Sequence, residues 1–470
     1  MTQVQYGGPR GGLGRAELEA LHERAMTVLT EVGLEVGHEE TLAFLRARPG
    51  FRVEGKIVKP RRALVEECVA AVRARASGRA EQKGGEWTLH VLPGCPMYIA
   101  DRRTGGVRPL TTADAVEAAR LVDALHERGV RGTSPGVPQD VPLEIQPIRT
   151  FRIGAENCRE GGSAQVASAR GARWLRRLME VMGQPYSLTL WVFNPLRVDG
   201  ETLAQLYELR GEPIGFGVGF MPLLGVTAPI HIMGGFALGL AAAWGAYALV
   251  RELTGREDIG LGCTLWPVDM HSLEIVFGTP EMVLIDLAAG EIADFYGFGG
   301  GGYTNAFHSS APLPDGQAAS GRGAYGMAMA LHGRRRFCWG GLLGVDLVFS
   351  PVQLMLDLEL MRFYRHVIEG FPATEEAFCL DAIREAGPSG GFLGHTSTLE
   401  GFGRVLWRPW LWRAGSVQAW QAAGSPRLEE RIAAEIEELL RSHDYRLPDD
   451  RARALDEVCR AAEADLLGAG

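Results

Sequence analysis

The chain has 470 residues, of which 46% are hydrophobic and 22% are charged, an ordinary composition for a globular protein. Its net charge of -9 argues against a nucleic-acid-binding function, because phosphate recognition requires a basic surface. The seven cysteines are odd in number and form no C-x-x-C pair, which predicts a reducing compartment without disulfides or a zinc site. Because the first residues lack the apolar core of a signal peptide, we expect a cytoplasmic protein.

One segment is apolar enough to raise the question of a membrane span. Residues 229–250 contain no Asp, Glu, Lys or Arg and are long enough to cross a bilayer. The segment is nevertheless built largely from Gly and Ala, and no second segment of this kind accompanies it. We therefore expect a buried helix whose small residues allow close packing.

Helical patterns dominate the first part of the chain. Apolar residues recur at helical spacing over residues 15–32 and again over 60–76. Residues 87–108 form shorter, strand-like runs that prolines and glycines interrupt. Thr111 or Thr112 is then expected to cap an amphipathic helix.

Strand and helix patterns alternate through the rest of the chain. Strands are predicted at residues 130–134, 164–168, 187–193, 213–220 and 259–265, with weaker ones at 298–303 and 337–343. Helices are predicted at residues 174–182, 200–209, 235–253, 279–296, 316–331 and 351–370. Such alternation of apolar strands with helices predicts an α/β fold, with a parallel sheet covered by helices.

With a further strand near residues 392–396, these units predict a TIM-type (β/α)8 barrel. A doubly wound open sheet is the runner-up, although no G-x-G-x-x-G follows the first strand. The barrel is assigned to residues 113–415, after an N-terminal helical and small β extension at 1–112. Helices at residues 428–440 and 455–467, within the C-terminal part 416–470, are expected to pack on the barrel.

The carboxyl ends of the predicted strands indicate the kind of ligand that a site there would bind. Functional residues of a barrel lie at these ends, which here are rich in aromatic rings and poor in acid–base pairs. Aromatic faces with one or two carboxylates suit a quaternary or protonated amine. For any single ring, a place in the core is the competing interpretation. The residues expected to bind such a substrate are Asp140, Phe220, Trp266, Asp269, Tyr303 and Trp339.

A run of glycines at residues 297–302 is the next candidate feature. Without side chains, the backbone there can approach a large flat cofactor closely, or the glycines relieve crowding inside a narrow barrel. The run lacks the Lys-Ser/Thr of a phosphate-binding loop. No G-x-S-x-G motif and no His or Cys ligand spacing occurs, so neither a nucleophile for acyl transfer nor a bound metal is expected.

Several segments, in the same order, resemble the trimethylamine:corrinoid methyltransferase family, whose members are TIM barrels. The segments are residues 101–109, 225–229, 268–270, 278–281 and, most specifically, 383–388 and 391–396 with Trp407 and Pro409 beyond. The resemblance implies methyl transfer from a methylated amine or betaine to the Co(I) corrinoid of a partner protein. It also implies that Gly300, Gly301 and His395 contact this cofactor, although a lone histidine such as His395 is often only structural.

The sequence departs from the family in ways that bear on the substrate. Trimethylamine-specific members carry pyrrolysine, whereas this chain has only standard residues. Spacing from residues 315–318 puts the equivalent position near residues 308–310, and His308 is the predicted catalytic residue there. The resemblance therefore points to a quaternary amine such as glycine betaine. Ala242 and His271-Ser272 also differ from the family's usual residues, which leaves the identity of the methyl donor open.

Two other interpretations remain open at this point. A lyase or hydrolase on the same scaffold would need a titratable pair, for which Asp269 and His271 are the candidates. A non-catalytic scaffold or binding subunit of a methyltransferase complex is the third interpretation. A homo-oligomer is expected from the family and from the small-residue helix.

Overall fold

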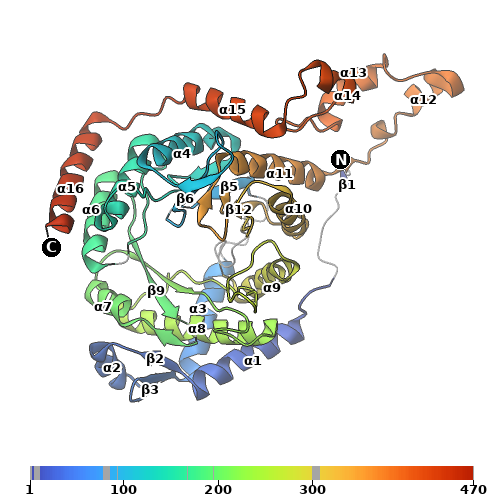
Figure 1. Ribbon diagram of the computed structural model, residues 1–470. Coiled ribbons are helices and arrows are strands. Elements are labelled where there is room, and N and C mark those ends of the chain that lie inside the picture. Colours follow the sequence, from blue (N-terminus) through green and yellow to red (C-terminus); the bar gives the residue numbers. More distant parts are fainter. Residues whose placement is uncertain are drawn as a thin grey trace.

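Successive helices form a ring around short strands (Figure 1). The computed structural model describes residues 3–4, 11–77, 85–92, 94–166, 168–193, 195–298 and 307–468. The fold is mixed α/β, with helices predominating. The ring consists of α4 (Thr112–Ala124), α5 (Gln146–Asn157), α6 (Ala169–Met182), α7 (Gly200–Leu209), α8 (Ile232–Thr254), α9 (Pro280–Tyr296), α10 (Gly316–Leu331) and α11 (Pro351–Glu369).

The strands form four separate sheets, and no closed ladder is present among the described residues. The largest sheet has the order β11 (Gly215–Phe220), β9 (Ser187–Phe193), β10 (Arg197–Val198), β2 (Leu34–Val36), β4 (Ile57–Pro60), β3 (Phe51–Glu54). A second has the order β12 (Arg336–Cys338), β5 (Thr88–Val91), β8 (Val130–Gly132). A third has the order β13 (Leu342–Leu343), β14 (Val348–Phe349), β6 (Tyr98–Ala100), β7 (Val107–Pro109). The fourth pairs β1 (Gln3–Val4) with β15 (Phe371–Pro372).

The strand predicted near residues 392–396 is wrong, because that segment is a turn leading into a helix. Its expected place, between the strand β8 and the strand β12, is taken by β5, which is parallel to both. β5 lies in the segment that the sequence assigned to the N-terminal extension. Strands β2 and β4 of that extension likewise join the sheet of β9 and β11.

The other strand predictions have mixed outcomes. The strand at residues 187–193 is confirmed, and those at 130–134 and 213–220 are confirmed over most of their length. Residues 164–166 and 168 form no strand, and residues 259–265 contribute only an isolated bridge between Gly260 and Gly217. Most of the segment 298–303 lies outside the described residues.

Helix predictions hold where a cap accompanies the apolar pattern. The side chain of Thr111 accepts a hydrogen bond from the backbone N–H of Asp114. The carboxylate of Asp114 accepts one from the backbone N–H of Thr111. These two bonds form a capping box, which starts α4. The side chains of Asp199 and Asp315 are the N-caps of α7 and α10, without a reciprocal bond. Both helices begin at the predicted residues. Pro280, in the first turn of α9, follows the N-cap Thr279.

The helix α8 contains the apolar segment and is mostly buried, as the sequence predicted. Length and composition would allow it to cross a membrane, but 78% of its most apolar window is buried inside the protein. Its glycines allow close packing: a Cβ on Gly245 would lie 2.7 Å from side-chain carbons of Leu29 and Leu34. Leu29 belongs to α1 (Arg15–Glu31), which crosses the outer side of α8 (Figure 1).

The remaining terminal helices pack on the outside of the ring. At the N-terminal end these are α2 (Glu39–Arg46) and α3 (Arg62–Ser77), of which α3 contacts α8 and α9. At the C-terminal end, α15 (Leu428–Ser442) packs on α4 and α11, and α16 (Asp449–Leu467) packs on α5 and α6. The carboxylate of Asp465 anchors α16 by accepting hydrogen bonds from Arg170 and Trp174 of α6.

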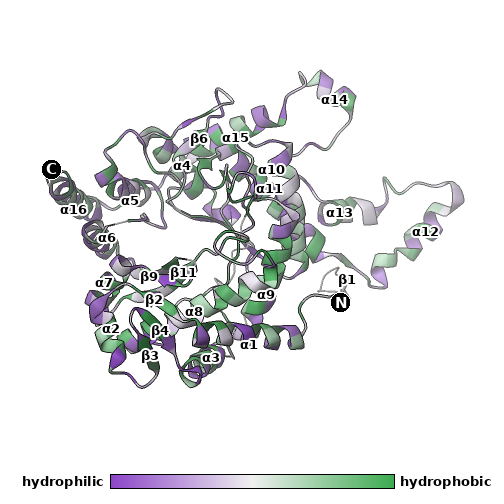
Figure 2. Ribbon diagram, turned by 60° about the horizontal axis from the view of Figure 1, so that its bottom comes forward, coloured by the Kyte–Doolittle hydropathy of each residue, from purple (hydrophilic) through white to green (hydrophobic). Residues whose placement is uncertain are grey.

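Between α11 and α15 the chain leaves the ring and returns. This excursion contains α12 (Leu380–Ala386), α13 (Thr396–Val405) and, nearer its end, α14 (Val417–Ala422). Both views show α12 at the far end of this excursion, away from the ring (Figures 1 and 2). The chain is anchored again where Leu411 is buried and Trp407 and Trp412 pack on Phe363 of α11.

Candidate functional site

Four rings, including three predicted site residues, form one cluster inside the ring of helices. His308 stacks on Phe277 with ring centroids 4.2 Å apart, and it meets the edge of Trp266 at 5.1 Å. Trp339 lies 5.5 Å from His308, and Trp266 lies 5.3 Å from Phe277. We call these four residues the aromatic cluster. Phe277 was missed by the sequence analysis.

The position of each ring follows from the elements beside it. Trp266 is in the segment after α8, where it pairs with Leu223 just beyond the end of β11. Phe277 directly precedes the start of α9, and its N–H donates to Ser310 Oγ at 2.8 Å. Trp339 follows β12 directly. Residues from strand ends and helix starts therefore meet at one point, although they are far apart in sequence.

Asp346 holds His308 in a fixed orientation. The Nδ1 atom of His308 lies 2.9 Å from Oδ1 of Asp346, and only 3% of the His308 side chain and 16% of the Asp346 side chain are exposed. Because this contact uses Nδ1, the other ring nitrogen, Nε2, is directed away from the carboxylate. That Nε2 is buried and has no hydrogen-bond partner in the described structure.

The loop that carries Asp346 has an unusual backbone. Gly344, Val345 and Asp346 have φ angles of 55°, 55° and 65°, so three consecutive residues are in the left-handed region. For a β-branched residue such as Val345 this conformation is strained, and strain of this kind is found mainly at functional sites. Trp339, with φ of 63°, is strained in the same way. The backbone is thus distorted at two of the residues that contact His308.

A buried ion pair stabilises the start of this loop. The side chains of Arg322, on α10, and Asp357, on α11, are fully buried and lie 2.5 Å apart. Asp357 also accepts a hydrogen bond from the N–H of Gly341 at 2.8 Å, and Arg322 donates to the carbonyl of Leu342. Burial raises the pKa of Asp357, against the lowering effect of Arg322. Two helices are thereby tied to the segment between Trp339 and Asp346.

A second unpartnered polar atom lies in the same cluster. The Nε1 atom of Trp266 is buried without a hydrogen-bond partner among the described residues, as is Nε2 of His308. Buried polar atoms are nearly always paired, so two such atoms on rings 5.1 Å apart are unusual. The indole N–H of Trp266 can only donate, so a group that pairs with it must be an acceptor.

Three other predicted substrate residues, Phe220, Asp140 and Asp269, do not belong to the aromatic cluster. Phe220 is 5% exposed and packs against α8, where a Cβ on Gly239 would be 3.3 Å from its ring. Phe220 is therefore a core residue between sheet and helix. Asp140 is exposed, and its Oδ1 accepts hydrogen bonds from the N–H and hydroxyl of Thr112 at the start of α4.

Asp269 lies at an exposed turn. Its carboxylate accepts hydrogen bonds from the N–H of His271 and the hydroxyl of Ser272, and these bonds lower the pKa of Asp269 below its ordinary value. The side chain of His271 is 99% exposed, so this pair lacks the burial that a hydrolytic or lyase site would provide.

The predicted cofactor contacts are separated from the cluster or lie outside the described residues. His395 caps the start of α13, on the segment that projects from the ring, by accepting a hydrogen bond from the N–H of Ser397. Its Nε2 lies 3.3 Å from Glu385 of α12. Tyr303, Gly300 and Gly301 lie outside the described residues.

An exposed apolar surface surrounds the carboxyl ends of β9 and β11. Leu223, which packs on the aromatic cluster, lies within this region. A Cβ on Gly225 would be 2.9 Å from Met270 Sδ and 3.0 Å from Ile230 Cδ1, which places these two side chains beside each other. We call this surface the apolar rim; its exposed members are Trp191, Phe193, Met221, Val226, Ile230, Met270 and Leu273.

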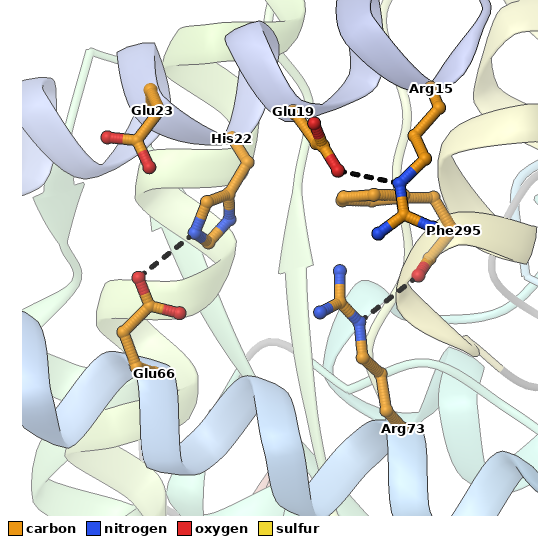
Figure 3. A pocket seen from close by; sticks show the side chains of 7 residues that line it. All are labelled: Arg15, Glu19, His22, Glu23, Glu66, Arg73 and Phe295. Carbon is orange, nitrogen blue, oxygen red and sulfur yellow. Dashed lines mark hydrogen bonds and ion pairs between the residues drawn. The ribbon is translucent and has the colours of Figure 1, made fainter.

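A separate cavity lies between α1, α3 and α9 (Figure 3). It has a volume of about 610 Å³ and is lined by Arg15, Glu19, His22, Glu23, Glu66, Arg73 and Phe295. Most of these side chains are occupied by ion pairs or hydrogen bonds with one another, as between His22 and Glu66 (Figure 3). None of the predicted site residues lines this cavity. In the part of the chain that the structure describes, no three His, Cys, Asp or Glu side chains could hold a metal ion.

Comparisons with known proteins bear on this geometry. Over 450 residues the chain is 23% identical to the glycine betaine methyltransferase of Desulfitobacterium hafniense strain Y51, covering 91% of each chain. It is 22% identical to a trimethylamine methyltransferase of Desulfitobacterium hafniense strain DSM 10664, covering 96% of this chain and 94% of that one. The crystal structure of the Methanosarcina barkeri monomethylamine methyltransferase is similar at a TM-score of 0.42 and 13% identity, covering 96% of this chain and 87% of that one.

The family comparison covers nearly the whole chain. The trimethylamine methyltransferase (MTTB) family matches residues 11–465, which include every residue of the aromatic cluster, Asp346 and the apolar rim. The resemblance predicted from the sequence is confirmed by this match. The chain therefore belongs to the trimethylamine methyltransferase family and is a methyltransferase.

Proposed function

We propose that this methyltransferase removes a methyl group from a betaine, a quaternary amine that also carries a carboxylate. The observation that carries the proposal is His308, whose buried and unpartnered Nε2 lies among aromatic rings while Asp346 holds Nδ1. Rings bind a quaternary ammonium group, while the indole N–H of Trp266, together with Nε2 of His308 when it is protonated, can donate to a carboxylate. The names of the relatives, a glycine betaine and a trimethylamine methyltransferase, support this substrate class.

We further propose that the ring of helices is a (β/α)8 barrel whose substrate site lies at the carboxyl ends of its strands. The parallel neighbours β8, β5 and β12, the parallel pair β9 and β11, and the order of α4 to α11 support this assignment. In the aromatic cluster, Trp266 pairs just beyond the end of β11 and Trp339 directly follows β12, as expected for such a barrel. The protein is proposed to act in the cytoplasm.

The corrinoid acceptor is proposed to reach the site on a partner protein at the apolar rim. The exposed apolar side chains fit the flat, largely apolar face of a corrin ring, whereas a charged surface would not. When it is bound there, the corrinoid supplies the Co(I) nucleophile. Trp191, Met270 and Leu273, each roughly half exposed, are the residues proposed to contact it.

The chain's own residues bind, orient and desolvate the substrate. Each ring face that contacts the ammonium group contributes about 0.5–2 kcal/mol. When Nε2 of His308 carries a proton, it can donate to the substrate carboxylate, and the contact of Nδ1 with Asp346 fixes the direction of the ring. Because a quaternary nitrogen leaves as a neutral amine, no side chain has to donate a proton to it.

The test supplies the purified protein with a Co(I) corrinoid and compares methylated amines by mass spectrometry of the demethylated product. Glycine betaine is expected to yield dimethylglycine, while choline, which lacks the carboxylate, and trimethylamine, which lacks the quaternary charge, react more slowly. Faster turnover of trimethylamine than of glycine betaine would overturn the proposed substrate class. Absence of demethylation with every amine tested would overturn the proposed function.

His308→Gln tests how the carboxylate is recognised. Because a hydrogen bond to a charged group contributes about 1.5–3 kcal/mol, kcat/KM for glycine betaine is expected to fall about 10- to 100-fold, with little change for choline. Asp346→Asn is also expected to lower kcat/KM for glycine betaine. The matched control is His332→Gln at the end of α10, outside the aromatic cluster. Equal losses on glycine betaine and choline would contradict a specific role in carboxylate binding.

A further inference from the structure

The cavity between α1, α3 and α9 is lined mostly by charged side chains (Figure 3). We call it the charged cavity. Its volume of about 610 Å³ is in the range of small-molecule sites. As far as the chain is described, its lining shares no residue with the aromatic cluster or the apolar rim. A ligand bound there would therefore be a second ligand, separate from the methyl donor.

The charges of the lining are of both signs. Arg62, on α3, donates to both carboxylate oxygens of Glu23, at 2.8 Å and 2.5 Å, so Glu23 is already bound in a bidentate pair. Two guanidinium groups and two carboxylates remain in the lining: Arg15, Arg73, Glu19 and Glu66. A simple anion or a simple cation would be repelled by part of this lining, whereas a molecule that carries both charges is complementary to it.

One side of the charged cavity presents a fixed acceptor. The Oε1 atom of Glu66 lies 3.2 Å from Nε2 of His22 and 3.2 Å from Arg62. The other ring nitrogen of His22 lies 3.0 Å from the hydroxyl of Tyr296, so both nitrogens of the ring are engaged. The second oxygen of Glu66 points into the cavity (Figure 3). This side is therefore suited to a group that donates an N–H bond.

The opposite side, beside Phe295, presents guanidinium groups (Figure 3). The Nε atom of Arg73 donates to the carbonyl of Phe295 at 3.2 Å, and its Cζ atom lies 4.5 Å from the centre of that ring. These contacts direct the terminal nitrogens of Arg73 into the cavity (Figure 3). Arg15 uses its Nε to contact Glu19 at 2.7 Å. Guanidinium nitrogens bind a carboxylate through paired, charge-assisted hydrogen bonds, so this side is suited to a carboxylate.

The acceptor side distinguishes between two kinds of ammonium group. A primary ammonium has three N–H donors and can pair with Glu66. A quaternary ammonium has no donor and is held by ring faces instead. In the charged cavity, the guanidinium of Arg73 already covers one face of Phe295. A primary amine therefore fits the charged cavity, whereas a quaternary amine fits the aromatic cluster.

We propose that the charged cavity binds a small molecule with a primary ammonium group and a carboxylate, such as an amino acid. Its carboxylate contacts Arg15 and Arg73, and its ammonium group contacts Glu66. The ligand joins α1 and α3 to α9, whose first residue follows Phe277 of the aromatic cluster by three positions. Such a ligand is an effector rather than a methyl donor, and the proposal does not depend on the identity of the methylated substrate.

Calorimetric titration of the purified full chain, without a corrinoid, tests the proposal. The probes are glycine, β-alanine, γ-aminobutyrate and L-leucine, each at millimolar concentration. At least one of them is expected to bind and to raise the melting temperature. Its Kd is expected to be at least about tenfold lower than the Kd of the matching amine or the matching carboxylate alone. Absence of binding by all four, or equally tight binding of a singly charged analogue, overturns the proposal.

Substitutions in the lining locate the ligand. Glu66→Gln is expected to raise its Kd about 10- to 100-fold, because a charge-assisted hydrogen bond is lost. Arg15→Gln is expected to raise it about two- to fivefold, and the side chain of Arg15 is 87% exposed, so this change does not threaten folding. The matched control is Glu67→Gln, at the next residue of α3, which is 67% exposed and should leave the Kd unchanged. Binding that survives Glu66→Gln but is lost in Trp266→Ala would put the ligand in the aromatic cluster and overturn the proposal.

Discussion

Helices α8 and α11 are both long, largely buried members of the ring, but they are held by different kinds of interaction. Every buried residue of α8 is uncharged, and glycines and alanines make up much of its buried surface. Helix α11 buries Gln353, Asp357 and Glu359. One helix is positioned by shape and the other by hydrogen bonds.

The difference matters because buried carboxylates of α11 bind the backbone of two distant loops, whereas the hydroxyl of Tyr247 on α8 donates to the carbonyl of Glu257 in the loop that follows α8. Asp357 binds the N–H of Gly341, before the strained turn of the site, and Glu359 accepts hydrogen bonds from the N–H groups of Trp410 and Leu411. Helix α8 makes close contacts with α1 and the sheet instead. Apolar packing stabilises a helix but does not depend on the orientation of particular groups. Buried hydrogen bonds are directional and hold particular backbone groups in place. The strained loop from Gly344 to Asp346 is on the side of the molecule where such bonds are found.

The largest expected effect comes from breaking the buried ion pair. Arg322→Met leaves Asp357 buried without its cation, which is expected to lower the free energy of unfolding by about 3–5 kcal/mol. The double variant Arg322→Met/Asp357→Leu should recover part of this loss, because no unpaired charge remains. Urea denaturation measures both values. If the free energy of unfolding of Arg322→Met falls by less than about 1 kcal/mol, the buried ion pair and its hydrogen bonds do not position α11.

A smaller effect is expected from filling space in α8. Gly245→Ala places a Cβ 2.7 Å from Leu29 and Leu34, and such overpacking is expected to cost about 1–3 kcal/mol. Gly323 is the matched control, since it is also inside a helix but has open space around it. Gly323→Ala should raise stability by about 0.5–1 kcal/mol, because alanine favours the helix. Equal effects of the two substitutions would mean that close packing does not position α8.

The smallest effect concerns a more exposed ion pair, Arg108 with Asp114 at the start of α4. Burial opposes the change, but hydrogen bonds from Arg108 and Thr111 lower the pKa of Asp114 to about 2. A carboxyl whose pKa is lower in the folded state stabilises the fold when the pH is above its pKa in the unfolded chain. This contribution is lost as the pH falls from about 4 to about 2. Asp114→Asn should therefore flatten the decline of the melting temperature in that range. If the melting temperature of Asp114→Asn declines as steeply as that of the wild-type protein, other groups cause the acid sensitivity.

The sequence predicted the elements whose signals are local. Helices α7 and α10 begin at the predicted residues because Asp199 and Asp315 mark their first turns. Residues 392–396 contain an apolar pair that resembles a strand, but they form a turn that pairs with no strand among the described residues. β5 was assigned to an extension because its four residues give no hint of the distant strands on either side.

The site could be predicted only in part. Trp266 was found because it follows a predicted strand and Trp339 because it lies in one, whereas His308 was found from its spacing to residues 315–318 in the family resemblance. Phe220 was misassigned, although β11 alternates glycine with large residues, a pattern that puts Phe220 on the helix side. Phe277 was missed because it follows no predicted strand, and the role of Asp346 depends on a left-handed turn that Val345 does not signal.

The pairing of β5 has a consequence for how the protein is made. Thr88 pairs with Arg336, 248 residues further along the chain, while its other neighbour, β8, lies only some forty residues away. During synthesis β5 can therefore pair with β8 early. The other edge of β5, which pairs with β12, stays unpaired until most of the chain has left the ribosome. Long-range closure of this kind is slow, and an open edge invites pairing with other chains. We expect truncations before residue 336 to aggregate, however well their individual helices form.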